Sequence, residues 1–154
     1  MPANPPLDGY DTRILAELQA DARISLAELG RRVHLSQPAV AERVRKLEAG
    51  GVITGYRATV NLAALGYGIR ALVRVGRTEY PGMVHLVGTL PEVVNAWNIT
   101  GEDSWLLEIA VTDVAHLDAV VSQLCNLAET STSIILKSVR EHQVMLPPTK
   151  ESPP

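Results

Sequence analysis

The chain has 154 residues, 46% of them hydrophobic, and a formal net charge of −3. This length fits one domain or two small ones with an ordinary hydrophobic core, and no apolar run approaches the roughly 20 residues that a membrane-spanning helix needs. The first residues lack the basic and apolar stretches of a secretion signal, and the single cysteine, Cys125, excludes an intramolecular disulfide and a cysteine-based metal cluster. We therefore expect a cytoplasmic protein.

Charge is unevenly distributed along the chain. Residues 1–57 carry a net charge of +1, residues 58–154 carry −4, and five of the six charged residues in 31–46 are basic. Because salt screens charges beyond roughly 8 Å under physiological conditions, a local basic face can bind phosphate even on an acidic protein. A nucleic-acid partner is therefore compatible with the N-terminal part of the chain.

Two short helices are predicted at the start of the chain. The first covers about residues 11–19, where apolar side chains recur at helical spacing. The second begins at Ser25, whose hydroxyl can cap the helix, and Glu28 three residues later completes the pattern of a capping box.

A third helix is predicted over residues 36–49. Ser36 can accept hydrogen bonds from the free amides of the first turn, and Pro38 is tolerated there because no intrahelical acceptor is lost. The apolar residues recur every three or four positions and are expected to face the other two helices: Val40, Val44 and Leu47. The four-residue link VHLS joins this helix to the second one, which is the arrangement of a helix-turn-helix unit.

The remaining surface of the third helix favours a nucleic-acid partner. Small residues near its start permit close approach to a groove floor, glutamine can read adenine, and arginine can read guanine or hold phosphate. The residues expected near bases are Ser36, Gln37, Pro38, Ala39 and Glu42. Those expected to hold the DNA backbone are Arg32, Arg43, Arg45 and Lys46, and Ser25 completes the DNA-binding set. A three-helix bundle without a partner is the alternative on spacing alone.

The segment VITGYRATVN alternates and contains a glycine turn, which predicts a small strand pair or wing. We therefore expect a winged helix-turn-helix DNA-binding domain over residues 7–57 and a linker strand over 58–67. At the other end, residues 147–154 are polar and proline-rich, and a disordered tail is expected there.

A second domain is predicted over residues 68–146. GIRALVRVGR reads as a strand; a short helix through Met83 follows, then the strands EVVNAWNIT and SWLLEIAV joined by GED, a helix capped by Asp113, and a last strand, TSIILKSVREHQVM. The order β-α-β-β-α-β is that of a ferredoxin-like α+β fold. Its helices cover one sheet face, and the other, expected to bear Trp97 or Trp105, needs a second copy of the chain as cover.

A dimeric ferredoxin-like enzyme and a protein-interaction module are the alternatives to a DNA-binding protein. Catalysis needs a nucleophile–base pair or convergent acid–base groups, whereas the four histidines are scattered over four predicted elements without metal-ligand spacing. We therefore expect no catalytic residue, no metal site and no cofactor. A steep salt dependence of duplex binding would distinguish a DNA partner from a protein partner.

The chain resembles the Lrp/AsnC, or feast–famine, family of transcriptional regulators over about residues 7–146. The specific segments are LDGYDTRILAELQADARISLAELGRRVHLS and VAERVRKLEAGGVITGYRATVN, and LPEV, TGED and TSTSIILKSV are shorter, weaker matches. The resemblance implies a sequence-specific DNA-binding regulator with a ferredoxin-like RAM, or ACT-like, second domain. It also implies homodimers formed through that domain, which assemble into tetramers or octamers.

The resemblance further implies a small amino-acid-like effector held near dimer–dimer contacts. The corresponding residues are Thr100, Gly101, Glu102, Asp103 and Ser104, with Thr130, Ser131, Thr132 and Ser133. Consecutive N–H groups in a tight turn at 101–103 can bind an anion, although turns without a ligand use the same residue types. Many family members carry Gly-x-Tyr-Asp in this hairpin, whereas here Asp103 stands at the aromatic position and Ser104 replaces the acid. Glu102 or Asp103 is then left to pair an ammonium group.

Overall fold

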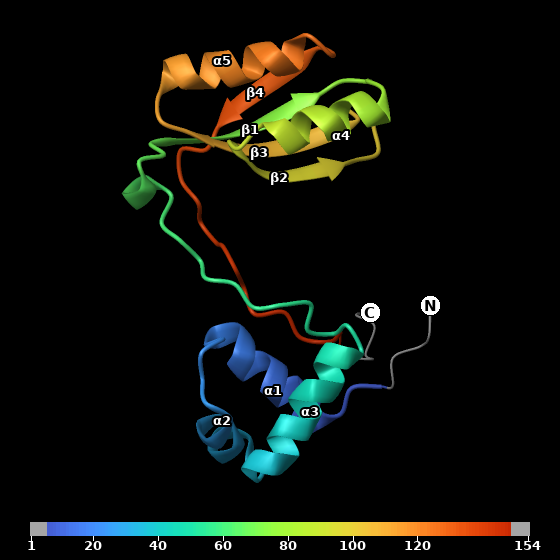
Figure 1. Ribbon diagram of the computed structural model, residues 1–154, viewed down its shortest axis with the longest axis vertical. Helices are drawn as coiled ribbons and strands as arrows, with labels where there is room; N and C mark the ends of the chain where they lie inside the picture. Colours follow the sequence, from blue (N-terminus) through green and yellow to red (C-terminus); the bar gives the residue numbers. More distant parts are fainter. Residues whose placement is uncertain (1–5, 149–154) are drawn as a thin grey trace, which may run out of the picture. The chain divides into compact units, whose positions relative to one another are not determined.

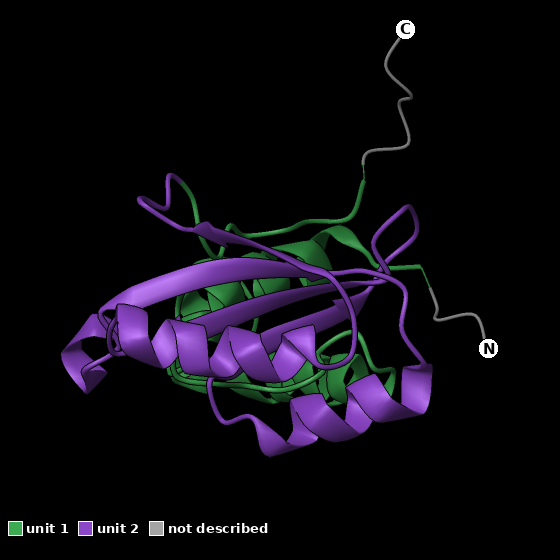
Figure 2. Cartoon of the chain, turned by 90° about the horizontal axis from the view of Figure 1, so that it is seen from above, with its two compact units in different colours: residues 1–59, 140–154 green, residues 60–139 purple. Residues whose placement is uncertain are grey.

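The structure is a computed structural model in which residues 6–148 are described. The chain divides into two compact units (Figure 2): unit 1 comprises residues 1–59 and 140–154, and unit 2 comprises residues 60–139. Each unit has a hydrophobic core of its own. No helix among the described residues is long and apolar enough to cross a membrane.

Unit 1 contains the helices α1 (Gly9–Ala20), α2 (Leu26–Val33) and α3 (Gln37–Ala49) (Figure 1). The three predicted helices are confirmed. Helix α1 begins two residues earlier than expected because the Asp8 carboxylate caps it, accepting hydrogen bonds from the backbone N–H groups of Tyr10 and Asp11. The core that the helices share is Ile14, Leu29, Val33, Val40, Val44 and Leu47, which includes the apolar stripe predicted on α3.

The caps of α2 and α3 decide how these helices are joined. Ser25 accepts a hydrogen bond from the Glu28 N–H, as expected, but the predicted capping box is wrong in its second half, because the Glu28 carboxylate bonds Arg31 and Arg32. Ser36 caps α3 by accepting from the Ala39 N–H. Between these helices His34 adopts the left-handed conformation, with φ 59° and ψ 45°, so the chain reverses direction within a short turn.

The strands predicted after α3 do not form. Residues 52–61, all described, contain neither a strand of the wing nor a strand pair, and the linker strand expected over 58–67 is replaced by extended chain and a short 3₁₀ helix, η1 (Ala63–Leu65). An isolated two-stranded hairpin is marginal in water without a surface to pack against, and residues 54–61 are exposed. The Tyr56 hydroxyl instead donates to the Glu48 carboxylate of α3, at 2.9 Å.

Unit 2 contains, in chain order, β1 (Ile69–Val75), α4 (Tyr80–Thr89), β2 (Val93–Asn98), β3 (Trp105–Val111), α5 (Val114–Cys125) and β4 (Thr130–Ile134). The strands form one antiparallel sheet in the order β2-β3-β1-β4, and α4 and α5 pack on one of its faces (Figure 1). The predicted ferredoxin-like α+β fold is therefore confirmed, including the cap of α5 by Asp113.

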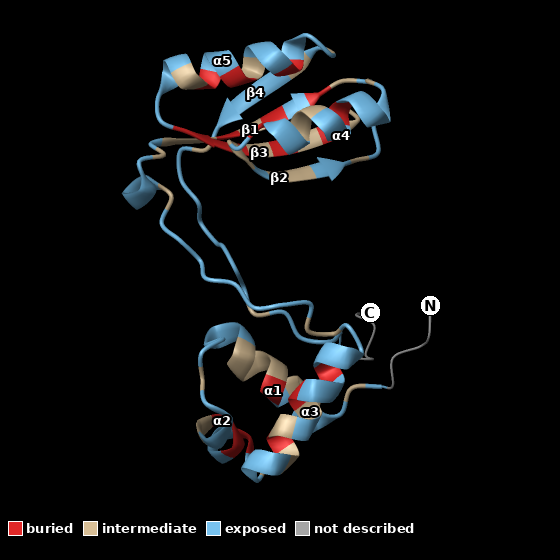
Figure 3. Cartoon of the chain, in the orientation of Figure 1, coloured by how far each residue is buried: buried red, intermediate tan, exposed pale blue. Residues whose placement is uncertain are grey.

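The two faces of the sheet differ in burial (Figure 3). On β1, Ala71, Val73 and Val75 are fully buried beneath the helices. Trp105 lies opposite Val75 and is 5% exposed, so the expectation that it lies on the uncovered face is wrong. Its ring packs against Tyr80 of α4, at 5.3 Å between ring centroids.

The uncovered face, here called the open face, carries Leu72, Arg74, Trp97, Leu106 and Glu108. The other predicted tryptophan belongs to this face and is 45% exposed. A partly buried ion pair joins Arg70 to Glu108 on the same face, and the Asn95 amide donates to the second oxygen of that carboxylate at 2.8 Å. The open face therefore combines apolar side chains with a paired charge.

The last strand is shorter than predicted. It covers Thr130–Ile134 instead of continuing to residue 145, because Ile134 already pairs with Ala71 near the start of β1 and only one further bond, from the Ile135 N–H to the Arg70 carbonyl, extends the ladder. The residues from 140 onward group with unit 1, where the Gln19 amide donates to the Met145 carbonyl and accepts from its N–H. Of the tail predicted over 147–154, residues 149–154 lie outside the described residues.

Candidate DNA-binding surface and effector region

The outward side of α3 presents the residues that the sequence places near bases. Ser36, Gln37, Pro38 and Glu42 are exposed, and Ala39 is half-buried. The apolar residues beneath them face the core of unit 1, so this side of the helix is available to a partner. Its position depends on Gly30 of α2, because a β-carbon there would lie 2.6 Å from the Leu35 carbonyl oxygen and would push the two helices apart.

Of the four cations predicted to hold the DNA backbone, Arg45 and Lys46 form ion pairs within α3 alone. Arg45 pairs with Glu42 at 2.8 Å on the same helix and is 67% exposed, and the Lys46 ammonium is 3.6 Å from the same carboxylate and 70% exposed. The Arg45 hydrogen bond lowers the pKa of Glu42. Exposed pairs of this kind contribute little, so a phosphate can replace Glu42 at either cation.

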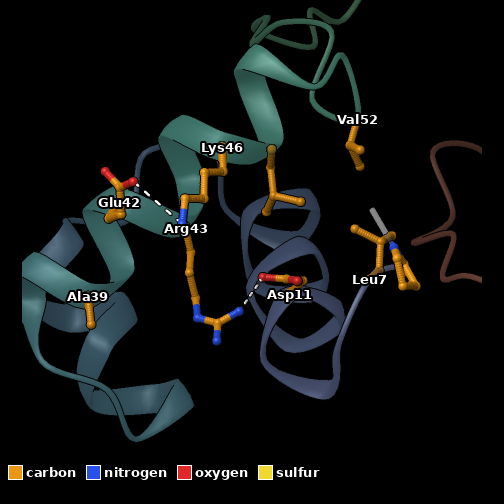
Figure 4. A pocket seen from close by; sticks show the side chains of 9 residues that line it. Leu7, Asp11, Ala39, Glu42, Arg43, Lys46 and Val52 are labelled. Atoms are coloured by element: carbon orange, nitrogen blue, oxygen red, sulfur yellow. Dashed lines mark hydrogen bonds and ion pairs between the residues drawn. The ribbon is translucent and has the colours of Figure 1, made fainter. Parts of the chain in front are cut away.

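Arg43 has a different environment. Its Nη1 donates to Asp8 at 2.8 Å and to Asp11 at 2.7 Å, both in or next to the first turn of α1. Figure 4 shows the bond to Asp11. The guanidinium also lies over the Tyr10 ring, 5.3 Å from its centroid. The bonds to Asp11 and Asp8 raise the pKa of Arg43, and the side chain is 31% exposed. Arg43 therefore bridges two helices.

Arg32 makes a similar bridge. It donates to Glu28 of its own helix and to Glu17 of α1, each at 2.8 Å. The bonds to Glu28 and Glu17 raise the pKa of Arg32. The predicted DNA-binding set did not include the neighbouring Arg31. This residue is 76% exposed and pairs with Glu28 on the same helix. The only signal for it in the sequence was its place beside Arg32 in a basic run.

A pocket of about 470 Å³ opens along the flank of α3 within unit 1 (Figure 4). Its apolar lining comes from Pro6, Leu7, Ala39, Leu47 and Val52, and its charged lining from Asp11, Glu42, Arg43 and Lys46.

Among the described residues, no group of three or more His, Cys, Asp and Glu side chains is arranged to hold a metal ion.

The two stretches assigned to the effector flank the same end of β1. The Ser104 N–H donates to the Val75 carbonyl at 3.0 Å, and Thr130 pairs with Val75 from the other side. Gly101 has φ +125°, which only glycine adopts readily, so the turn before β3 requires it. The structure therefore brings Thr100–Ser104 and the start of β4 to one end of the sheet.

The individual groups in this region do not all converge. Ser131 and Ser133 lie opposite Arg74 and Leu72 and share the open face with them, whereas Thr130 and Thr132 alternate to the helix-covered side. The Thr130 hydroxyl lies 3.0 Å from the sulfur of Cys125. Asp103 is 4.0 Å from Arg74. Arg74 was not among the predicted effector residues, although the strand β1 on which it lies was predicted.

Comparisons with known proteins agree with this architecture. The family model for the AsnC-type helix-turn-helix domain matches residues 7–48, and that for the Lrp/AsnC ligand binding domain matches residues 70–145. The chain is 37% identical over 141 residues to the leucine-responsive regulatory protein of Rhizobium meliloti (strain 1021), covering 88% of this chain and 90% of that protein.

Solved structures have the same fold. LrpC of Bacillus subtilis matches with a TM-score of 0.84 and 31% identity over 88% of this chain and 99% of that chain. A transcriptional regulator from Neisseria meningitidis, in complex with L-Met, matches with a TM-score of 0.84 and 27% identity over 91% of this chain and 96% of that chain. Matches at this level over nearly the whole chain show that the protein belongs to the Lrp/AsnC family of transcriptional regulators.

Proposed function

We propose that the chain is a cytoplasmic, sequence-specific DNA-binding regulator of transcription. Its DNA binding responds to a small amino-acid-like effector. The observation that carries this proposal is α3, which has a buried apolar stripe on one side and exposed polar and cationic residues on the other. In a helix-turn-helix unit the second helix of the motif enters the major groove. Here that helix is α3.

The DNA-facing residues follow from exposure and charge. Ser36, Gln37, Pro38, Ala39 and Glu42 lie on the part of α3 proposed to face base edges, and Arg45 and Lys46 hold the phosphate backbone. Ser25 caps α2, and the N-terminus of a helix is a favourable place for a phosphate. In a dimer the two copies of α3 would enter successive major grooves, about 34 Å apart.

The test begins with a duplex that the unaltered chain selects from a randomised library. Gln37→Ala should relax specificity at one position by roughly 1–3 kcal/mol if the amide makes a bidentate base contact. Arg45→Ala should weaken all sequences alike and reduce the salt slope by about 0.9. Failure to select any duplex would contradict the proposal, and unchanged binding by both variants would place the contact surface elsewhere.

We further propose that the effector binds at the end of the sheet marked by Gly101 and Thr130. No hydrogen bond within residues 6–148 uses the backbone N–H groups of Gly101, Glu102 and Asp103, so these groups can donate to the carboxylate of a ligand. Thr100, Ser104 and the β4 hydroxyls of Ser131 and Ser133 add polar groups at its edge, whereas Thr130 and Thr132 lie on the helix-covered side of β4. An acid of the loop can pair the ammonium. The L-Met bound to the Neisseria meningitidis relative supports this ligand class.

Calorimetry against the twenty amino acids tests the effector site. We expect one or a few of them to bind and to change the mass of the assembly or its affinity for the selected duplex. Gly101→Trp should abolish this binding, because the side chain would occupy the turn and the required φ of +125° disfavours it. Binding that survives Gly101→Trp would place the ligand elsewhere, and no binding by any amino acid would contradict an amino-acid effector.

The same family membership supports a homodimer that assembles into tetramers or octamers. In a monomer Trp97 would remain 45% exposed on the open face, next to the half-buried Leu72 and Leu106. Exposed apolar side chains on an uncovered sheet face mark an interaction site. A second copy covers it with the same surface, as a two-fold interface requires.

A further inference from the structure

We propose that Arg43 and Arg32 are positioning residues, which fix α3 and α2 against α1 and do not bind the DNA backbone. The inference rests on the proposed DNA-binding function, and it changes the role that the sequence alone suggests for both arginines. It also gives a role to the acidic residues of α1, which would otherwise only repel DNA.

The first support is the way one guanidinium joins α3 to the start of α1. Asp8 and Asp11 cap that helix through a reciprocal capping box, and both also accept from Arg43, which lies 35 and 32 residues further along the chain, respectively. Figure 4 shows the Arg43 side chain extending from α3 toward Asp11 and away from Glu42. The two carboxylates that cap α1 therefore also hold the Arg43 side chain of α3.

The second support is that Arg32 repeats this chemistry farther along α1. It joins Glu17 of α1 to α2, again with two carboxylates around one guanidinium. Each of the two helices in the helix-turn-helix unit is thus tied to α1 by one arginine. Two such ties restrict how α2 and α3 can turn relative to α1, and therefore which side chains of α3 reach the base edges.

The third support is the cost of the alternative. To bind a phosphate through the same Nη1, Arg43 would give up two charge-assisted hydrogen bonds, which are about twice as strong as neutral ones. It would also leave the carboxylates of Asp8 and Asp11 unpaired close to the negatively charged DNA. Arg45 faces no such cost, since its one carboxylate partner is on its own helix and both groups are exposed.

The two roles predict different responses to salt. A cation that neutralises a phosphate releases a counterion. Removing that cation therefore makes the slope of log K against log salt concentration less steep by about 0.9 on every duplex. A residue that only orients α3 leaves this slope unchanged. Its loss lowers the ratio of affinities for the preferred duplex and an unrelated one, because the base-reading side chains are displaced.

The experiment uses the full chain, the duplex that it selects from a randomised library, and a scrambled duplex of the same length. Affinities are measured over a series of salt concentrations for Arg43→Gln, with Arg45→Gln as the matched control on the same helix. We expect Arg43→Gln to lower the affinity ratio roughly tenfold with an unchanged slope. Arg45→Gln should lower the slope by about 0.9 on both duplexes and leave the ratio unchanged. Arg32→Gln should behave as Arg43→Gln does.

Asp11→Asn provides an independent test of sign. The asparagine oxygen can still accept the Asp8 N–H, which bonds the Asp11 carboxylate at 3.1 Å, but the ion pair with Arg43 is lost. If Arg43 is a positioning residue, Asp11→Asn lowers the affinity ratio although a negative charge has been removed. The double variant, Asp11→Asn with Arg43→Gln, then has the same affinity ratio as Arg43→Gln alone. If Arg43 contacts phosphate, releasing its guanidinium from Asp11 strengthens binding to both duplexes equally.

Circular dichroism and urea unfolding show whether each variant is folded, and Arg43→Lys replaces Arg43→Gln if the latter does not fold. Lysine keeps the positive charge but lacks the planar guanidinium that joins the two carboxylates. A lower affinity ratio at an unchanged salt slope in Arg43→Lys therefore again supports the positioning role. An affinity ratio equal to that of the unaltered chain overturns it. A slope lowered by about 0.9 in Arg43→Gln also overturns the inference. If the unaltered chain selects no duplex, it is the proposed function that fails.

Discussion

At the scale of single residues, His34 shows that the turn between α2 and α3 contains strain that can be relieved. Its φ of 59° lies in the left-handed region, which costs a residue with a β-carbon about 1–2 kcal/mol. Glycine avoids that cost but loses roughly 0.5–1 kcal/mol in chain entropy. His34→Gly should therefore increase the free energy of unfolding of unit 1 by on the order of 0.5 kcal/mol, measured by urea unfolding. His34→Ala keeps the strain and should give no gain; a loss in His34→Gly would show that the imidazole itself stabilises the turn.

Asp113 couples the stability of unit 2 to pH. The backbone N–H of His116 donates to its carboxylate at 2.9 Å, and this bond, followed by the Thr112 hydroxyl, lowers the pKa of Asp113. A carboxyl whose pKa is lower in the folded state stabilises the fold above its unfolded pKa, about 3.9, and loses that contribution as pH falls through the folded value. Asp113→Asn keeps the cap but cannot titrate.

Unfolding of Asp113→Asn should therefore depend less on pH below about pH 4 than unfolding of the unaltered chain. Both tryptophans, Trp97 and Trp105, lie in unit 2, so their fluorescence reports this unit. Asp118→Asn, which makes the same substitution at an exposed residue of the same helix, is the control. Identical profiles for the two variants would show that the cap does not contribute to the acid response.

At the scale of elements, the contact between α2 and the turn that follows it requires glycine. A β-carbon at Gly30 would lie 2.6 Å from the Leu35 carbonyl oxygen, which is backbone and cannot move aside without shifting α3. Gly30→Ala should destabilise unit 1 by roughly 1–3 kcal/mol, the usual cost of overpacking. Gly9→Ala makes the same substitution at the start of α1 with nothing within 4 Å. It should be neutral or stabilising, and equal effects at both sites would contradict the steric explanation.

Helices could be predicted from the sequence more completely than strands, for a physical reason. The caps and apolar stripe of α3 are local, so Ser36, Val40 and Leu47 suffice to predict it. A strand forms only where another strand pairs with it. VITGYRATVN alternates but pairs with no strand within residues 6–148, and the last strand ends where Ile134 pairs with Ala71 near the start of β1. Alternation indicates which residues suit a strand, and pairing decides where the strand ends.

The candidate DNA-binding surface was also predictable only in the part that depends on local sequence. The exposed residues of α3 follow from helical spacing, so their presence on one surface was predictable. The roles of Arg43 and Arg32 were not, because their carboxylate partners in α1 are 15 to 35 residues away and no local pattern indicates them. Trp105 illustrates the same limit, since its register opposite Val75 determines its burial.

At the scale of the whole molecule, the register of β1 identifies the side chain with which to test assembly. Val73 is fully buried beneath the helices, so a charge there would unfold unit 2 and would not report on dimers. Leu72 is half-buried and lies on the open face, between Glu108 and Ser133 of the neighbouring strands. A charge at Leu72 therefore changes the open face and leaves the core of the unit intact.

Leu72→Asp should convert the proposed dimer to a folded monomer in light scattering at micromolar concentration. It should also weaken binding to a duplex with two half-sites, because the second copy of α3 then binds without the effective concentration that dimerisation provides. Val84→Asp places the same charge at an exposed apolar residue of α4, on the covered side of the sheet, and should change neither property. A monomeric unaltered chain would contradict the proposed assembly. A Leu72→Asp variant that remains dimeric would show that another surface joins the copies, and Trp97 would then need a different partner.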